Sequence, residues 1–92
     1  MLSVKYTAKF RKDARLAKKR GFPIQELQKV VSMLREEIPL EPKYYDHALE
    51  GDWRGFRECH IQPDWLLIYR IDHGEMILVA QRTGTHSDLF GK

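Results

Sequence analysis

The sequence lacks paired cysteines and long apolar stretches. Cys59 is its single cysteine, so no internal disulfide can form, and one cysteine with four scattered histidines does not match zinc-finger spacing. No apolar run approaches the ~18 residues of a membrane-spanning helix. The first twenty residues lack the apolar core of a secretory signal. These absences favour a cytoplasmic protein with no structural metal and no membrane contact.

Linkers and low-complexity tracts are absent as well. The 92 residues are therefore expected to form one domain, residues 1–92. Hydrophobic residues make up 42% of the chain and charged residues 32%, which is typical of a globular protein with one modest core.

Positive charge is concentrated at the start of the chain. Residues 1–20 hold eight lysines and arginines and one aspartate, a net charge of +7, whereas the remaining residues carry −4. Lys12, Arg15, Lys18 and Lys19 belong to this segment and form a candidate surface for RNA. A charge run alone is also what a solvated helix face looks like, so the other residues must decide between the two interpretations.

The first half of the chain predicts a short strand at residues 4–6 and two amphipathic helices. Thr7 is a plausible N-cap of the first helix and Gly21 its stop. Pro23 suits the first turn of the second helix, which is expected to run to about residue 38, before Pro39. Apolar residues recur at helical spacing in two groups: Phe10, Ala14 and Ala17, then Ile24, Leu27, Val31, Leu34 and Ile38.

The second half predicts three β-strands, Trp53–Ile61, Trp65–Ile71 and Met76–Arg82. The turns between them are short, so the strands should be antiparallel. Thr85 could cap a short helix over residues 86–90. The expected fold is therefore α+β, with an N-terminal strand and a helical hairpin packed on an antiparallel sheet and a short C-terminal helix.

This meander gathers polar residues at one edge of the sheet. The first predicted strand ends at that edge, the second begins there and the third ends there. The residues placed there are His60, Asp64, Trp65 and Arg82, and the following segment TGTHSDLF adds His86 and Phe90. His73 lies in the opposite turn. His47 precedes the first strand and could approach the site if it pairs back on that strand.

Two imidazoles, a carboxylate and a guanidinium at one edge suit phosphodiester cleavage. A 2′-hydroxyl must lose a proton, the leaving 5′-oxygen must gain one, and the phosphorane must be neutralised. Histidine, with an unperturbed pKa of ~6.5, can serve either proton role at neutral pH. Arg82 offers a planar fork for phosphate oxygens. Trp65 and Phe90 offer faces on which unpaired bases could stack.

Each of these residues also has a simpler interpretation. His60 could be a half-buried strand residue, and Asp64 is a favoured turn residue after proline. Trp65 alternates with apolar residues and could belong to the core. Arg82 could pair with a carboxylate such as Asp88. His86 could merely begin a helix, and Phe90 could merely pack it down. The convergence of all of them at one edge favours a site.

Several segments resemble one family. LEGDWRGFREC is a pattern shared across the RelE/ParE superfamily of bacterial toxins. HIQPDWLLIYRID, RTGTHSDLF and the upstream YDHAL resemble the YafQ family within it. The resemblance covers nearly the whole chain. It implies a RelE-like, microbial-RNase-like α+β fold. It also implies a toxin of a type II toxin–antitoxin pair that cleaves mRNA in the ribosomal A site without a metal or other cofactor.

The family's functional positions carry over to this sequence without a departure: His47, His60, Asp64, Arg82, His86 and Phe90. Trp65 lies in the same motif. His86 is the expected general acid, and Asp64 or His60 the expected base. Arg82 would neutralise the phosphorane, while His47 would orient phosphate. The basic first helix would bind ribosomal RNA.

The partners implied are mRNA on the ribosome and a cognate antitoxin, expected to be a DinJ-like ribbon-helix-helix protein. DNA would be contacted only through that antitoxin. Two alternatives remain: a ParE-like inhibitor of DNA gyrase, which shares the fold without the histidine-rich edge, and a non-catalytic RNA- or ribosome-binding module. A pure binder would use lysine and arginine rather than histidine, which argues against both.

Overall fold

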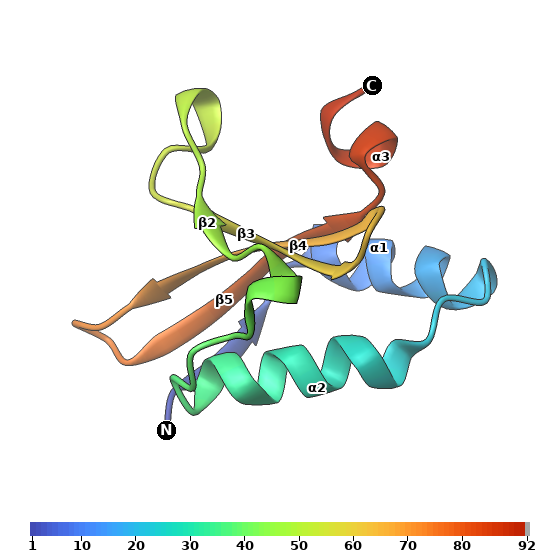
Figure 1. Ribbon diagram of the computed structural model, residues 1–92. Helices are drawn as coiled ribbons and strands as arrows, with labels where there is room; N and C mark the ends of the chain where they lie inside the picture. Colours follow the sequence, from blue (N-terminus) through green and yellow to red (C-terminus); the bar gives the residue numbers. More distant parts are fainter. Residues whose placement is uncertain (92) are drawn as a thin grey trace.

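The computed structural model describes residues 1–91, which form a five-stranded sheet with helices on both of its sides (Figure 1). The expected α+β class is confirmed. The principal elements are β1 (Ser3–Tyr6), α1 (Ala8–Lys19), α2 (Ile24–Arg35), β2 (His47–Ala48), β3 (Arg57–Gln62), β4 (Trp65–Asp72), β5 (Ile77–Gly84) and α3 (His86–Phe90). Two short 3-10 helices, η1 (Pro42–Tyr44) and η2 (Gly51–Trp53), flank β2. None of the helices in residues 1–91 is long and apolar enough to cross a membrane.

The sheet has the strand order β1-β5-β4-β3-β2. Strands β3, β4 and β5 form the expected antiparallel meander, and β2 adds to β3. β1 forms the other edge of the sheet, opposite β2, and pairs parallel with β5. Ser3 lies opposite Ile77 and Tyr6 opposite Ala80. The first and last thirds of the chain are thereby joined, and β5 becomes an inner strand of the sheet.

The caps of α1 follow from its sequence. Thr7 Oγ1 accepts a hydrogen bond from Phe10 N at 2.9 Å, as expected of an N-cap. At the other end Gly21 adopts a left-handed φ of 81°, and Phe22 N donates to Ala17 O. This is a Schellman stop, which glycine adopts without the steric cost of a Cβ atom. Phe10 and Ala17 are buried on the inner face of the helix.

Helix α2 ends earlier than the apolar spacing predicted. It stops at Arg35, and Ile38 lies outside it with 49% of its surface exposed. The reason is a second Schellman arrangement, in which Ile38 N donates to Met33 O while Glu37 takes a left-handed φ of 56°. A glutamate in the position that glycine usually occupies gives no sequence signal for the stop.

The predicted first strand of the meander also began too early. Residues 51–53 form η2, and Gly55 turns the chain at a φ of 94°, so that β3 begins at Arg57. The rings of Trp53 and Phe56 pack edge to face at 5.4 Å within this loop. These two apolar rings therefore pack within the loop and do not belong to a strand.

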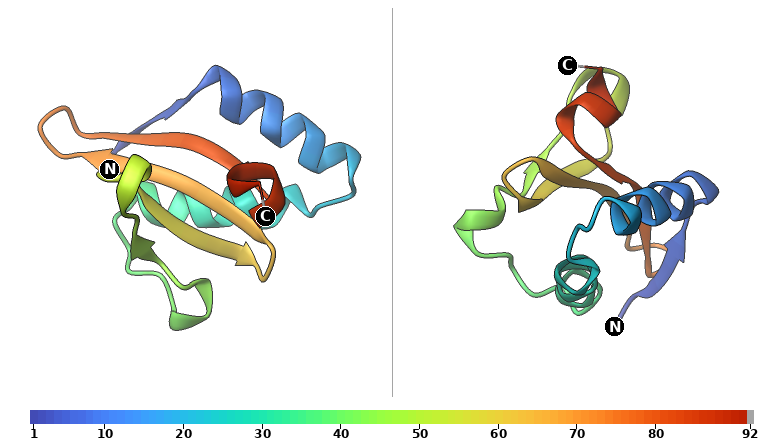
Figure 2. Two further views of the ribbon diagram at one scale, coloured as in Figure 1. Left: turned by 90° about the horizontal axis from the view of Figure 1, so that it is seen from above. Right: turned by 90° about the vertical axis from the view of Figure 1, so that its right-hand side faces the viewer.

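One face of the sheet carries the core. Trp65, Leu67 and Tyr69 of β4 are buried there with residues of α1 and α2, including Phe10 and Val30. On the other face, α3 and the segment around β2 rise from the sheet (Figure 1). Seen from above, α3 lies beside the β3–β4 turn (Figure 2). The residues expected at the polar edge come from these segments.

Candidate active site

The turn between β3 and β4 sets the corner of the site. The pairing of His60 with Leu66 shifts by one residue before Gln62 pairs with Trp65, so β3 bulges just ahead of the turn. A bulge adds local twist and redirects side chains. His60 Nδ1 donates to the carbonyl oxygen of Pro63 at 3.3 Å, because a carbonyl oxygen only accepts. The imidazole is thus fixed against its own turn.

His86 is held by Asp64 through two contacts. The Asp64 Oδ1 atom lies 2.6 Å from His86 Nδ1 and accepts a hydrogen bond from His86 N at 2.9 Å. The backbone bond, followed by the side-chain bond, lowers the pKa of Asp64 from its usual value, so this carboxyl is ionised at neutral pH. An ionised carboxylate only accepts, so Nδ1 carries the hydrogen and Nε2 faces away from Asp64.

His47 and His60 share a third group, Glu58, which the sequence analysis did not single out. The Glu58 Oε1 atom lies 3.2 Å from His47 Nε2 and 3.4 Å from His60 Nε2. Glu58 is 5% exposed and one of two buried polar residues among residues 1–91. His47 Nδ1 donates to Ala48 O at 3.1 Å, and Nε2 is the ring nitrogen that faces the Glu58 carboxyl.

Strand alternation could have identified Glu58. Residues 58 and 60 lie two apart on β3 and therefore face the same side of the sheet. His47 lies directly opposite Glu58 in the β2–β3 register, which confirms that His47 pairs back toward the site. The sequence contained the first signal, but the two-residue strand that supplies the second is too short to predict.

The imidazoles form a continuous row across the corner. The rings of His60 and His86 lie 5.6 Å apart, and Tyr45 lies 5.5 Å from His60 on its other side. Four sequence-predicted residues are thereby brought together, namely His47, His60, Asp64 and His86. His73 is not among them, because it lies in the opposite turn and contacts Glu37 at 2.6 Å.

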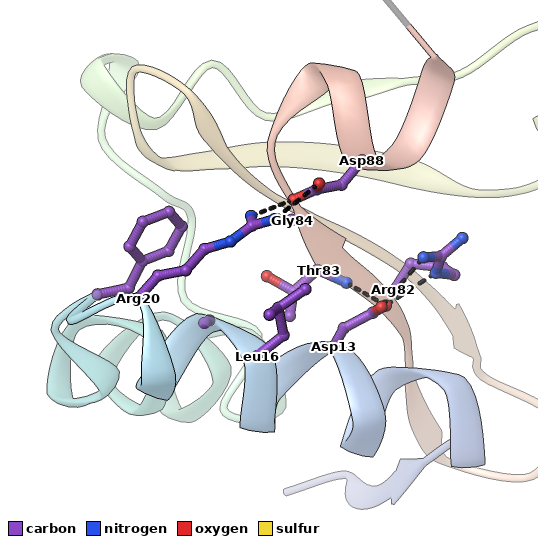
Figure 3. Close-up of a pocket in the computed structure, with 9 residues that line it drawn as sticks. Asp13, Leu16, Arg20, Arg82, Thr83, Gly84 and Asp88 are labelled. Carbon is purple, nitrogen blue, oxygen red and sulfur yellow. Dashed lines mark hydrogen bonds and ion pairs between the residues drawn. The ribbon is translucent and has the colours of Figure 1, made fainter.

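Arg82 is engaged elsewhere. Its Nε and Nη2 atoms donate to Asp13 of α1 at 2.8 Å and 3.0 Å, and Thr83 N donates to the same carboxylate at 3.2 Å (Figure 3). The bond to Asp13 raises the pKa of Arg82 from its usual value, despite partial burial. The partner suggested by the sequence, Asp88, instead binds Arg20 at 2.6 Å.

Trp65 was wrongly predicted to offer a face for base stacking. Its side chain is 1% exposed and packs against Phe22 with ring centroids 5.1 Å apart. The interpretation that the alternating pattern places it in the core is therefore the correct one. Phe90 lies on α3 and is partly exposed, so its side chain stays available on the same side as His86.

The basic face of α1 is exposed, as the charge pattern predicted. Lys12, Arg15, Lys18 and Lys19 all lie at the surface. Lys12, Arg15 and Lys19 line a groove of about 490 Å³ that also includes Arg82. Arg82 is therefore continuous with the basic face of α1, whereas no contact joins it to the imidazoles within residues 1–91.

His47, Glu58 and His60 could also hold a metal ion. One donor atom from each residue lies within 4.8 Å of the others. Two imidazole nitrogens and a carboxylate oxygen are a donor set that suits transition metals such as zinc or copper. The same three residues are therefore candidates both for proton transfer and for cation binding.

The chain matches a family model described as the bacterial toxin of the type II toxin–antitoxin system, YafQ, over residues 2–91. A curated relative, the mRNA interferase toxin YafQ of Escherichia coli strain K12, is 39% identical over 89 residues. That alignment covers 96% of this chain and 95% of the relative.

Two solved structures of other proteins have the same fold as this chain. A metal-bound toxin from Helicobacter pylori is 48% identical, with a TM-score of 0.93 over 98% of this chain and 100% of that one. The toxin in the Escherichia coli DinJ–YafQ complex is 38% identical, with a TM-score of 0.89 over 99% of this chain and 100% of that one.

Proposed function

The chain belongs to the YafQ family of type II toxin–antitoxin toxins, whose curated relatives are mRNA interferases, and we propose that it cleaves mRNA in the ribosomal A site by acid–base chemistry. The 2′-hydroxyl attacks the adjacent phosphorus and the 5′-oxygen leaves. The products are an RNA ending in a 2′,3′-cyclic phosphate or 3′-phosphate and an RNA beginning with a 5′-hydroxyl. The observation that carries this proposal is the close pair of imidazoles, His60 and His86, which lie edge to face with centroids 5.6 Å apart.

His86 is the proposed general acid. Asp64 binds its Nδ1 atom at 2.6 Å and its backbone N at 2.9 Å, which fixes both the ring and the start of α3. Nε2 faces away from Asp64, so the imidazolium form of His86 can deliver its Nε2 proton to the leaving 5′-oxygen. Asp64 then acts as a positioning residue rather than as the base, because the bonds from His86 lower its pKa and make it a weak proton acceptor.

The base is proposed to be His60 together with Glu58. Glu58 lies behind His60 Nε2 at 3.4 Å and shares its carboxyl with His47 at 3.2 Å. His60 Nδ1 already carries the hydrogen that it donates to Pro63 O, so Nε2 is the atom that would take the proton from the 2′-hydroxyl and pass it to this buried carboxylate.

Arg82 is proposed to neutralise the phosphorane. Within residues 1–91 its Nε and Nη2 atoms are bound by Asp13, and Nη1 has no protein partner. A phosphate oxygen could therefore bind Nη1 while Asp13 keeps the guanidinium in place. Lys12, Arg15, Lys18 and Lys19 would bind ribosomal RNA, and a DinJ-like ribbon-helix-helix antitoxin is the proposed protein partner, by analogy with the DinJ–YafQ complex.

A metal ion is not needed for this chemistry. A relative has been crystallised as a metal-bound toxin, and His47, Glu58 and His60 fit a transition metal by donor type and spacing. Such an ion would act as a Lewis acid at that position. It would also occupy the nitrogen and oxygen atoms that we assign to the base.

The test of the proposal is His86→Gln. Glutamine keeps much of the size and a donor but does not titrate near neutral pH. General acid–base assistance is typically worth ~10²–10⁴ in rate, so single-turnover cleavage of a ribosome-bound message should fall by about that factor. Ribosome binding should be unchanged, because the loss falls on the chemical step. His73→Gln is the matched control, because His73 also contacts a carboxylate at 2.6 Å but at the opposite end of the sheet.

A second substrate isolates the acid role. Replacing the scissile 5′-oxygen by sulfur creates a leaving group that hardly needs a proton. His86→Gln should recover most of its lost rate on this substrate, whereas His60→Gln should not. Equal defects on both substrates would contradict the assignment of His86. A chelator selective for transition metals, which leaves ribosomal Mg²⁺ in place, should not slow the wild-type protein.

A further inference from the structure

A groove lies beside His60, and His86 is not part of its walls. Its volume is about 580 Å³, and its walls include Tyr44, Tyr45 and His60 together with Glu26, Lys43 and Gln62. A cavity of that size is within the range of small-ligand sites. The proposed roles of His47, Asp64, Arg82 and His86 do not involve this groove.

Tyr45 is unusual in both exposure and backbone. It is 68% exposed, although Tyr44 beside it is buried. It adopts a left-handed conformation with φ of 46° and ψ of 46° at the end of η1. A bulky residue in this region is a rare and strained choice, and such strain tends to gather at functional sites. A glycine or asparagine would satisfy the turn at lower cost.

The Tyr45 ring continues the row formed by the imidazoles. Its centroid lies 5.5 Å from that of His60 at an interplanar angle of 60°, and His60 in turn lies 5.6 Å from His86. A group that enters the groove therefore contacts the same imidazole that we assign to the 2′-hydroxyl. In an RNA strand, a single ribose separates the scissile phosphate from the adjacent nucleobase, so a nucleobase is the substrate group that can reach this groove.

We propose that this groove is a nucleobase subsite, in which a base next to the scissile phosphate stacks on Tyr45. This proposal rests on the proposed cleavage of mRNA and specifies how that substrate is held. Gln62 offers both a donor and an acceptor to the edge of the base, Glu26 an acceptor and Lys43 a donor. An unpaired RNA base is recognised by this combination of an aromatic face and polar groups at its edge.

Tyr45 provides the face for base stacking that the sequence pattern had suggested for Trp65. The tryptophan is 1% exposed and cannot stack on a base, whereas Tyr45 presents most of its ring to solvent next to the same turn. The aromatic that serves the substrate is therefore supplied by the loop before β2 and not by the strand after the turn.

The experiment is single-turnover cleavage of a ribosome-bound message by Tyr45→Ala and Tyr45→Phe. Loss of a stacked aromatic should slow Tyr45→Ala by about 10-fold or more, and phenylalanine should retain the rate. Met76→Ala is the matched control. Met76 is also exposed, at 46%, with a left-handed φ of 55°, but it lies in the opposite turn. It should cleave as the wild type does.

An abasic nucleotide identifies the base that fills the groove. Messages carry it on the 5′ or the 3′ side of the scissile phosphate. At one of these positions, the wild-type protein should fall to the rate of Tyr45→Ala, and Tyr45→Ala should lose nothing further. Losses that multiply at both positions would overturn the subsite, as would a Tyr45→Ala variant with the wild-type rate and cut sites.

Two other outcomes separate the possible failures. If Tyr45→Ala cleaved normally but bound the antitoxin more weakly, the groove would belong to the antitoxin, which overturns the subsite. If neither the wild type nor Met76→Ala cut the message, the proposed nuclease function itself would be wrong. Cleavage by the wild type together with the predicted loss in His86→Gln keeps the function and leaves the subsite to be judged by Tyr45 alone.

Discussion

The histidine corner and helix α1 differ in how their charged groups are used. At the corner, His47, His60 and His86 each lie next to a carboxylate, and the rings of His60 and His86 pack edge to face. Along α1, two ion pairs fix the helix to the sheet and to α3, while the other cations remain at the surface. Charged groups thus form a candidate reaction site at the histidine corner. Along α1, they form both the ion pairs that fix the helix and an open cationic surface.

The comparison shows that net charge does not reveal the role of a cation. Arg20 belongs to the +7 segment, yet it binds Asp88 through Nη1 at 2.6 Å and Nη2 at 3.2 Å. Lys12 and Arg15 belong to the same segment and line an open groove. The engaged cation and the open cations differ only in their tertiary contacts, which join residues 68 or 69 positions apart in the sequence.

Removal of the open cations should produce the largest effect on this side of the molecule. Reversing the charge of Lys12, Arg15, Lys18 and Lys19 to glutamate should weaken ribosome binding by about 10²-fold at moderate salt and reduce the slope of log affinity against log salt. Sedimentation with ribosomes over a salt series measures both. The sulfur-containing message should still be cut when the protein is in excess. An unchanged slope would show that these residues form only a solvated helix face and do not bind RNA.

Loss of the Asp13 clamp should have a smaller effect. Asp13→Ala leaves the Arg82 guanidinium and Thr83 N without their shared carboxylate, and the side chains of Asp13 and Arg82 are only 14% and 19% exposed. The free energy of unfolding should fall by about 1–3 kcal/mol, measured by urea denaturation. Asp52→Ala, in the exposed η2 segment, is the control and should change it little. Equal stability of both variants would contradict the clamp.

The Arg20–Asp88 pair should contribute least, and its contribution should depend on pH. The bond to Arg20 lowers the pKa of Asp88 to about 2, from a usual 3.8. A lowered carboxyl pKa stabilises the fold above pH ~4, and that stabilisation falls to about half near pH 3. Arg20 is 38% exposed, so solvent screening keeps the contribution of this pair small.

Asp88→Asn isolates this charge, because asparagine can still accept the hydrogen bond from Thr85 N that completes the cap of α3. The difference in unfolding free energy between wild type and variant should be full at pH 7 and shrink as pH falls. A difference that stays constant from pH 7 to 3 would show that the ion pair contributes nothing measurable.

The sequence predicted the elements better than their contacts. Periodicity and caps located α1, β4, β5 and α3, and the direction of the meander placed His60, Asp64 and His86 together while excluding His73. The predictions failed where local and tertiary signals conflicted. Trp65 was assigned to RNA because of its place at the polar edge, yet its strand alternation buries it. Glu58 was not predicted as part of the site, because its two imidazole neighbours, His47 and His60, come from different elements.

The parallel pairing of β1 with β5 has a consequence for folding kinetics. His47, Glu58, His60 and Asp64 lie within 18 consecutive positions and can assemble from local hairpins. His86 reaches them only once β5 is in place, and the contact that closes the sheet, Thr7 Oγ1 to Gln81 O at 2.8 Å, spans 74 residues. Long-range closure is slow because the chain loses the entropy of the closed loop before the stabilising contacts form. The corner residues of β3, β4 and α3 can thus assemble from the local β3–β4–β5 meander before the sheet closes. Arg82 is fixed later, because its partner Asp13 lies on α1 and meets it only through the long-range closure.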